Sequence, residues 1–150
     1  MAEKPNETHL GYIQTTITRM AQNSFQAKTW CITVICALLV FYLEQTQEAV
    51  RSKCMIASIT AVLLFGILDV YYLYLERGYR YLYNVAAGLV VPKKPIKAYE
   101  MSIPKSERGF KKYLKALWSP STGLFYLIIM LLLIALWTFT SRYIIPLTAV

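Results

Sequence analysis

Residues 123–141, with the sequence GLFYLIIMLLLIALWTFTS, decide the fold class of this chain. The stretch contains no charged residue, and its length matches the roughly 20 apolar residues that a helix needs to cross the hydrocarbon core of a bilayer. Pro120 precedes it and Arg142 follows it, so the apolar run has clear ends. We therefore predict a transmembrane helix over residues 123–141.

Two further apolar segments lie earlier in the chain. Residues 55–75 are interrupted only by Asp69 and end in tyrosines, which are typical of the headgroup level of a membrane. Residues 30–43 form a shorter run, for which a buried or re-entrant helix is the alternative to a span. If the helix begins at residue 25, it is long enough to cross the membrane, and the Lys28 side chain extends to the membrane interface. The sequence thus predicts two more spans, over residues 25–43 and 55–75.

The composition agrees with a membrane protein. Of the 150 residues 57% are apolar and 16% are charged, whereas a soluble domain carries roughly 25% charged residues. Little of the chain remains for a water-soluble core once the apolar runs lie in a bilayer. We expect an all-α membrane protein with a single membrane domain over residues 1–150. The net charge of +8 favours anionic partners.

The uneven distribution of basic residues predicts the orientation of the spans. Residues 76–118 contain ten Lys and Arg against three Glu. Because short cytoplasmic loops carry an excess of Lys and Arg, this segment is expected in the cytoplasm. With three spans, the N-terminus is then cytoplasmic, and residues 44–54 and the C-terminus are periplasmic. The predicted location is the inner membrane of a bacterium.

The first two spans are expected to continue as helices into the cytoplasm. No proline interrupts residues 9–29 or 76–85, and Ile13, Ile17, Met20 and Ser24 follow one helical stripe. The two extensions form an antiparallel helical hairpin. A turn near residue 49 would place Lys28 beside Asp69 and Arg19 beside Glu76. Since ionisable groups in a span are costly unless they are paired, we predict these two pairs.

Residues 105–118 are expected to form a basic amphipathic helix after an extended linker over residues 88–104. Apolar residues recur at helical spacing, and basic residues occupy the other positions. The apolar residues are Phe110, Tyr113, Leu114, Leu117 and Trp118, and the basic residues are Arg108, Lys111, Lys112 and Lys115. Such a helix belongs in the interface of the inner leaflet, where anionic lipid attracts each basic residue.

Few residues are suited to catalysis. The single histidine, His9, lies in a terminal segment and is expected to be solvated, and Cys31 and Cys36 fall on different helix faces. Metal-ligand spacing and phosphate-binding glycine loops are both absent from the sequence. We therefore expect a protein that is not an enzyme and that has no cofactor and no metal site.

Three features each have two interpretations. Asp69 in a span marks an ion path or gate, or it forms a structural pair with Lys28. Six tyrosines within residues 71–83, interleaved with Arg77 and Arg80, suit stacking on single-stranded nucleic acid or form an interfacial aromatic belt. Polar residues in the spans line a pore in an oligomer or bond back to their own helices. These polar residues are Thr33, Ser58, Thr60 and Thr138.

Three sequence segments resemble a family of small three-span bacterial membrane effectors of antiphage defence. They are RMAQNSFQAKTW at residues 19–30, DVYYLYLER at 69–77 and RYLY at 80–83. The chain is also similar in size and layout to the channel effector of the Hailong system. The likeness covers about residues 10–85, and the last third shares only a basic loop and a final span.

The resemblance implies a homo-oligomeric ion channel in the inner membrane, with a tetramer favoured. A nucleotide or single-stranded DNA oligomer, made by a partner nucleotidyltransferase, would open this channel. The membrane then depolarises and growth stops before phage are released, which is abortive infection.

These considerations give one main hypothesis and one alternative. The hypothesis is a ligand-gated pore of antiphage defence, in which Asp69 and Glu76 hold the closed packing. The expected ligand-binding residues are Arg19, Lys28, Arg77, Tyr79, Arg80, Tyr81 and Tyr83. The alternative is a passive membrane anchor or accessory subunit, whose basic helix docks anionic lipid or a partner protein.

Overall fold

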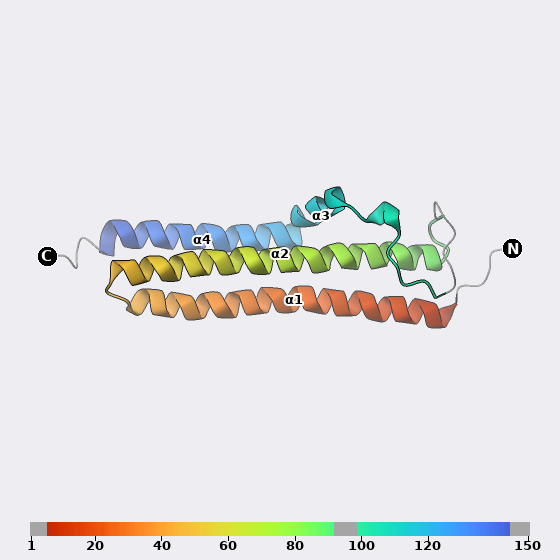
Figure 1. Ribbon diagram of the computed structural model, residues 1–150, viewed down its shortest axis with the longest axis horizontal. Coiled ribbons are helices and arrows are strands. Elements are labelled where there is room, and N and C mark those ends of the chain that lie inside the picture. Colours follow the sequence, from red (N-terminus) through yellow and green to blue (C-terminus); the bar gives the residue numbers. More distant parts are fainter. Residues whose placement is uncertain (1–5, 92–98, 145–150) are drawn as a thin grey trace. The chain divides into compact units, whose positions relative to one another are not determined.

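A computed structural model describes residues 6–91 and 99–144 of the protein (Figure 1). These residues contain helices and connecting segments, without a β-strand. The α-helices are α1 (Glu7–Glu44), α2 (Glu48–Ala86), α3 (Phe110–Leu117) and α4 (Phe125–Phe139). Short helical turns of other types lie at Lys105–Glu107, Pro120–Leu124 and Thr140–Ile144.

Three helical stretches are long and apolar enough to cross a membrane. They are Glu7–Glu44, Glu48–Ala86 and Pro120–Arg142. This finding confirms the all-helical fold class and the three candidate spans. At 1.5 Å per residue, α1 and α2 are each about 57 Å long, which exceeds the roughly 30 Å of a hydrocarbon core. Both helices therefore contain more residues than a single span needs.

Sequence features explain where the long helices begin and end. Asn6 caps α1, because its side-chain carbonyl accepts a hydrogen bond from the backbone N–H of His9 at 3.2 Å. Helix α2 ends at Ala86, and Gly88 follows it with a φ of 74°, which suits glycine. There the N–H of Leu89 donates to Asn84 O at 2.8 Å and that of Gly88 donates to Val85 O at 3.0 Å. This bonding pattern is a Schellman cap, and it satisfies the last carbonyls of α2.

The chain separates into two compact units, and α1 and α2 contribute residues to both. The first unit comprises the described residues of Met1–Gln26 and Asp69–Leu117, and the second those of Ala27–Leu68 and Trp118–Val150. The expected single domain over residues 1–150 stays a prediction.

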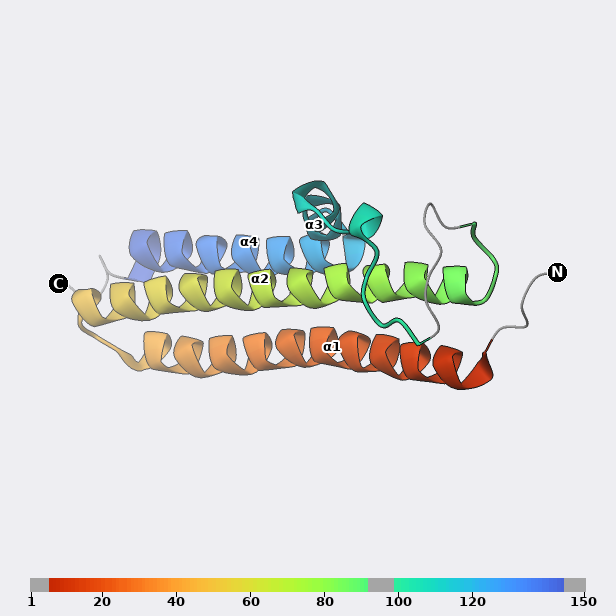
Figure 2. The same ribbon diagram turned by 45° about the vertical axis from the view of Figure 1, so that its right-hand side comes forward.

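In the first unit, α1 and α2 run antiparallel (Figure 2). Ile13, Ile17 and Leu82 form the buried core, with Tyr79, Tyr83, Ala86 and Met101 packed around it. The predicted stripe on α1 is confirmed, because Ile13, Ile17, Met20 and Ser24 are all buried.

The predicted register of these two helices is wrong. The turn between α1 and α2 falls at residues 45–47, not near residue 49. Ser24, which precedes Lys28 by one helical turn, hydrogen-bonds Asp69. The two helices are therefore displaced by about one turn from the predicted alignment.

The amphipathic helix is shorter than predicted. Arg108 is extended and Gly109 has a φ of 141°, so the chain leaves helical geometry before α3 begins at Phe110. Ala116 is the buried residue of α3, whereas Phe110, Leu114, Leu117 and Trp118 are exposed. Of the expected linker over residues 88–104, residues 92–98 lie outside the described part of the chain.

The second unit is a bundle of α4 with the adjoining parts of α1 and α2. Its buried core consists of Cys31, Ile35, Tyr42, Met55, Val62 and Leu133. The Tyr126 ring packs over Gly66, and its hydroxyl donates a hydrogen bond to Phe65 O at 3.2 Å. At the other end of α4, Thr140 hydrogen-bonds Tyr42. Both ends of α4 are thus fixed by a tyrosine.

Candidate functional site

A buried polar seam runs along the first unit. Asp69 is fully buried on α2, and Glu76 is 8% exposed two helical turns further along the same helix face. The Ser24 hydroxyl, which is also buried, donates a hydrogen bond to the Asp69 carboxylate from α1. Two carboxylates in the buried face of an apolar helix are costly, so this seam is the strongest candidate for a functional element.

Glu76 forms an ion pair with Arg80. Both Nη2 and Nε of Arg80 approach the same carboxylate oxygen, at 2.7 and 2.8 Å. The predicted pairing with Arg19 is wrong: Arg19 is exposed, and no described contact joins it to Glu76. An acid and a base four residues apart on one helix meet without any constraint from the register of the hairpin, which explains why Arg80 is the partner.

Arg77 connects α2 to α3. Its Nη1 donates a hydrogen bond to Lys115 O at 3.0 Å, near the end of α3, where the carbonyls of a helix attract positive charge. Tyr74 also links α2 to α3. Its ring contacts the Tyr113 ring edge-on, with 6.1 Å between the ring centres, and its hydroxyl accepts a hydrogen bond from the Gly109 N–H at 3.4 Å. Arg77, expected to bind a ligand, thus positions α3.

The candidate stacking tyrosines do not share one surface. Tyr79 and Tyr83 are one helical turn apart and pack against the core of Ile13, Ile17 and Leu82. Tyr81 lies between them in sequence, so it falls on a different side of α2. All three rings are half-buried. The predicted set therefore does not form a single aromatic platform within one chain.

Lys28 belongs to the second unit, where its Nζ lies 6.0 Å from the centre of the Phe125 ring. Its side chain is half-buried. The predicted pair with Asp69 joins residues of two units and stays a prediction.

His9 is buried, and the expectation of a solvated residue is wrong. Only 6% of it is exposed, and its Nε2 lies 3.1 Å from Glu100 O. Because a carbonyl only accepts, Nε2 carries the proton in this bond. The His9 ring also meets the Tyr99 ring at 5.7 Å. Tyr99 and Glu100 lie far from His9 in the sequence, with a separation of 91 positions for Glu100, so no local sequence signal identifies them.

The polar residues of the spans bond to their own helices, as one of the two interpretations predicts. Thr33, Ser58 and Thr60 each donate to the carbonyl four residues earlier, and Thr138 donates to Ala135 O. Each of these hydroxyl groups therefore donates its proton to a carbonyl oxygen of its own helix.

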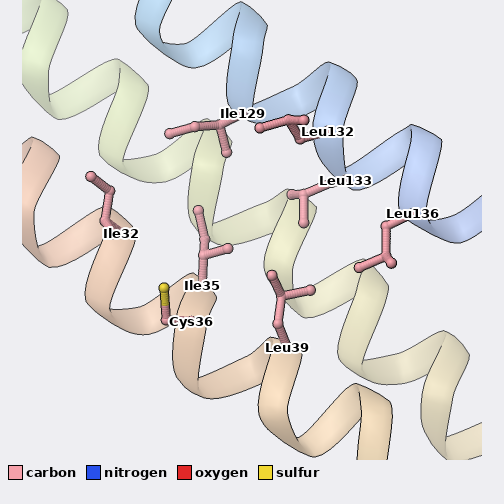
Figure 3. A pocket seen from close by; sticks show the side chains of 8 residues that line it. All are labelled: Ile32, Ile35, Cys36, Leu39, Ile129, Leu132, Leu133 and Leu136. Atoms are coloured by element: carbon pink, nitrogen blue, oxygen red, sulfur yellow. The ribbon is translucent and has the colours of Figure 1, made fainter.

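An apolar crevice lies between α1 and α4 in the second unit (Figure 3). Its volume is about 210 Å³, and the Cys36 thiol is its most polar side chain. The lining residues are Ile32, Ile35, Cys36, Leu39, Ile129, Leu132, Leu133 and Leu136. The apolar side chains of the two helices point toward one another across this space (Figure 3). The crevice could therefore hold an apolar group such as an acyl chain, but its lining does not favour ions.

The metal-ligating side chains of the described residues lie apart from one another. Within residues 6–91 and 99–144, no three His, Cys, Asp or Glu side chains are grouped to hold a metal ion. Cys31 is buried and Cys36 is exposed, which confirms that the two thiols lie on different helix faces. A comparison with protein-family models, curated proteins and solved structures finds no match for this chain.

Proposed function

We propose that this chain is a membrane effector of antiphage defence that acts as a ligand-gated ion channel or pore. Several copies, with a tetramer favoured, assemble in the bacterial inner membrane. A nucleotide or single-stranded DNA oligomer from a partner nucleotidyltransferase opens the assembly, and depolarisation of the membrane stops growth.

The observation that carries this proposal is the full burial of Asp69 in a helix that is long and apolar enough to span a membrane. An ionisable residue in such a helix marks a functional site by default, because an apolar side chain would pack there at lower cost. Ser24 and Glu76 extend the polar character along the same seam. A buried polar contact of this kind is compatible with two alternative packings of α1 against α2, one closed and one open.

Oligomerisation is a necessary part of the proposal. The second unit has a core of apolar side chains, and its described crevice is apolar. Three helices cannot by themselves enclose a water path, and the described core between them is filled by apolar side chains. A conducting path therefore has to form between copies, along helix faces that a single chain leaves exposed.

The exposed basic side chains of the first unit support recognition of an anionic ligand. Arg19 and Arg80 are exposed, and Tyr81 offers a half-buried ring on α2. Guanidinium groups bind phosphates in a bidentate manner, and aromatic rings stack on bases. We place the ligand contacts at these three residues first. Arg80 is paired with Glu76, but 65% of its side chain is exposed. Arg77, Tyr79 and Tyr83 are less accessible, because they pack or hydrogen-bond within the chain.

The test is membrane potential in living cells. The chain is expressed in a bacterium with and without a candidate partner nucleotidyltransferase and phage challenge, and a voltage-sensitive dye is followed. We expect depolarisation only when the trigger is present. Arg19→Ala is expected to abolish the response, whereas Thr18→Ala, on an exposed neighbouring residue, leaves it unchanged. An unchanged potential with the protein present in the inner membrane would refute the channel.

A second candidate function is a passive anchor or accessory subunit. The observation that favours it is α3, where exposed Phe110, Leu114 and Leu117 alternate with exposed lysines. Such a surface binds anionic membranes through apolar insertion and charge. This function predicts that Lys111→Ala with Lys112→Ala releases the chain from its lipid or protein partner, while Arg19→Ala has no effect.

A further inference from the structure

An arginine with an unsatisfied guanidinium nitrogen is buried at one end of the second unit. Arg51, in the first turn of α2, is 9% exposed, and its Nε is buried without a hydrogen-bond acceptor. The described residues supply no ion pair to this guanidinium. Arginine stays protonated in proteins, so Arg51 is a buried positive charge that needs a counter-charge.

The surroundings of Arg51 are built to hold the guanidinium in place. Its central carbon lies 4.9 Å from the centre of the Tyr42 ring, a cation–π contact. Thr140 donates its hydroxyl proton to a carbonyl of its own helix, Leu136 O or Trp137 O, so Tyr42 is the donor in the bond to Thr140. Tyr42 is thus fixed by α4, and its ring offers a rigid face to Arg51.

The site lies where three candidate spans end. Tyr42 is near the end of α1, Arg51 near the start of α2 and Thr140 just beyond α4, and the end of α4 lies beside the α1–α2 turn (Figures 1 and 2). Phe41, Leu43 and Phe139 are more than half exposed in the same region. Exposed apolar side chains near the end of a span contact the acyl chains of the bilayer, and the residues at the very end of the span lie at the depth of the phospholipid phosphates.

We infer that Arg51 binds the phosphate of a phospholipid, with Tyr42 and Thr140 as the supporting residues. The guanidinium supplies the positive charge and the planar donors that phosphate oxygens accept. The exposed apolar residues beside it contact the acyl chains of the same lipid, which favours a membrane phospholipid over free phosphate. This site needs only that the three helices lie in a membrane, and it is independent of channel activity.

Lipid binding to the full chain in an uncharged detergent tests the site. After removal of native lipid, dioleoyl phosphatidylglycerol is added, and bound lipid is counted by native mass spectrometry. Arg51→Met is expected to weaken binding by about tenfold or more, because a charged hydrogen-bonded contact is lost. Lys53→Gln removes one positive charge from an exposed position two residues away and is expected to leave binding unchanged.

Further arms identify the ligand and guard against misfolding. Arg51→Lys keeps the charge but loses the planar donors, so we expect an intermediate affinity. Each variant is checked for helix content by circular dichroism. Dioleoylglycerol, which lacks phosphate, and inorganic phosphate are expected to raise the melting temperature less than phosphatidylglycerol does.

Several results would overturn the assignment. Equal lipid binding by the wild type and Arg51→Met would show that the guanidinium does not hold the lipid. If inorganic phosphate alone raised the melting temperature as much as phosphatidylglycerol does, the site would bind free anions. Loss of an oligomer on Arg51→Met with lipid binding intact would identify the counter-charge as a carboxylate of a second copy.

Discussion

The Ser24 hydroxyl contributes to the environment of the buried Asp69 carboxylate. Ser24 donates to it across the hairpin, and both side chains are buried. A hydrogen bond to a charged group contributes more than one between neutral groups, and loss of the donor leaves part of the carboxylate unsatisfied. Ser24 is therefore a positioning residue for the polar seam.

We expect Ser24→Ala to lower the free energy of unfolding by about 1–3 kcal/mol, because the Asp69 carboxylate loses the hydrogen bond from Ser24. The measurement is unfolding of the detergent-solubilised protein by circular dichroism. Thr18→Ala is the control, since the exposed Thr18 hydroxyl bonds Gln14 O of its own helix. The control is expected within about 0.5 kcal/mol of the wild type. Equal effects of the two variants would contradict a role for Ser24.

Close packing at one glycine joins α2 to the segment that precedes α3. A Cβ at Gly78 would lie 2.8 Å from Cδ1 and Cγ2 of Ile103, which is closer than carbon atoms approach without a shift. At Gly66, on the same helix, a Cβ would lie 3.6 Å from the Tyr126 ring, an ordinary contact. The two glycines of α2 therefore differ in what they tolerate.

Gly78→Ala is expected to displace Ile103 and to increase the rate of tryptic cleavage at Lys105 and Arg108 by about tenfold, because local opening becomes easier. Gly66→Ala is expected to leave that rate unchanged and to raise the melting temperature, since alanine favours a helix by about 1 kcal/mol over glycine. The double variant Gly78→Ala with Ile103→Ala is expected to be cleaved slowly again, because the smaller side chain at position 103 removes the close contact. Equal cleavage rates in the two single variants would show that residue 78 is not crowded.

The elements themselves show what the sequence determines. Hydropathy places the three candidate spans, because about 20 apolar residues in a row have few alternatives to a helix. The register of α1 against α2 was not predictable, since residues 44–54 contain no glycine or proline to locate the turn. The start of α3 depended on the φ of Gly109, which periodicity does not reveal. The partners of His9 depended on tertiary contact with the Tyr99–Glu100 region.

At the scale of the whole chain, the clearest feature is the concentration of positive charge in residues 76–118. Seven of its ten Lys and Arg lie in the described part of the chain, and all of these except Arg77 are exposed. The candidate spans contain few charges by comparison. Exposed basic residues in a chain with apolar helices support both proposed functions, because phosphate-bearing ligands and anionic lipids are each attracted to positive charge.

The same charge asymmetry predicts the topology, which reporter fusions measure. A fluorescent protein that does not fold in the periplasm is expected to fluoresce when it is fused before residue 1. The same protein fused after residue 150 is expected to show no fluorescence. Alkaline phosphatase, which needs the periplasm, should show the opposite pattern. Because Lys and Arg near the ends of spans set orientation, replacing Lys111, Lys112 and Lys115 together with Gln should weaken the bias and give a mixed population. A bright fusion after residue 150 would place the basic segment outside the cytoplasm, and a ligand made by a cytoplasmic enzyme would then not reach Arg19 and Arg80.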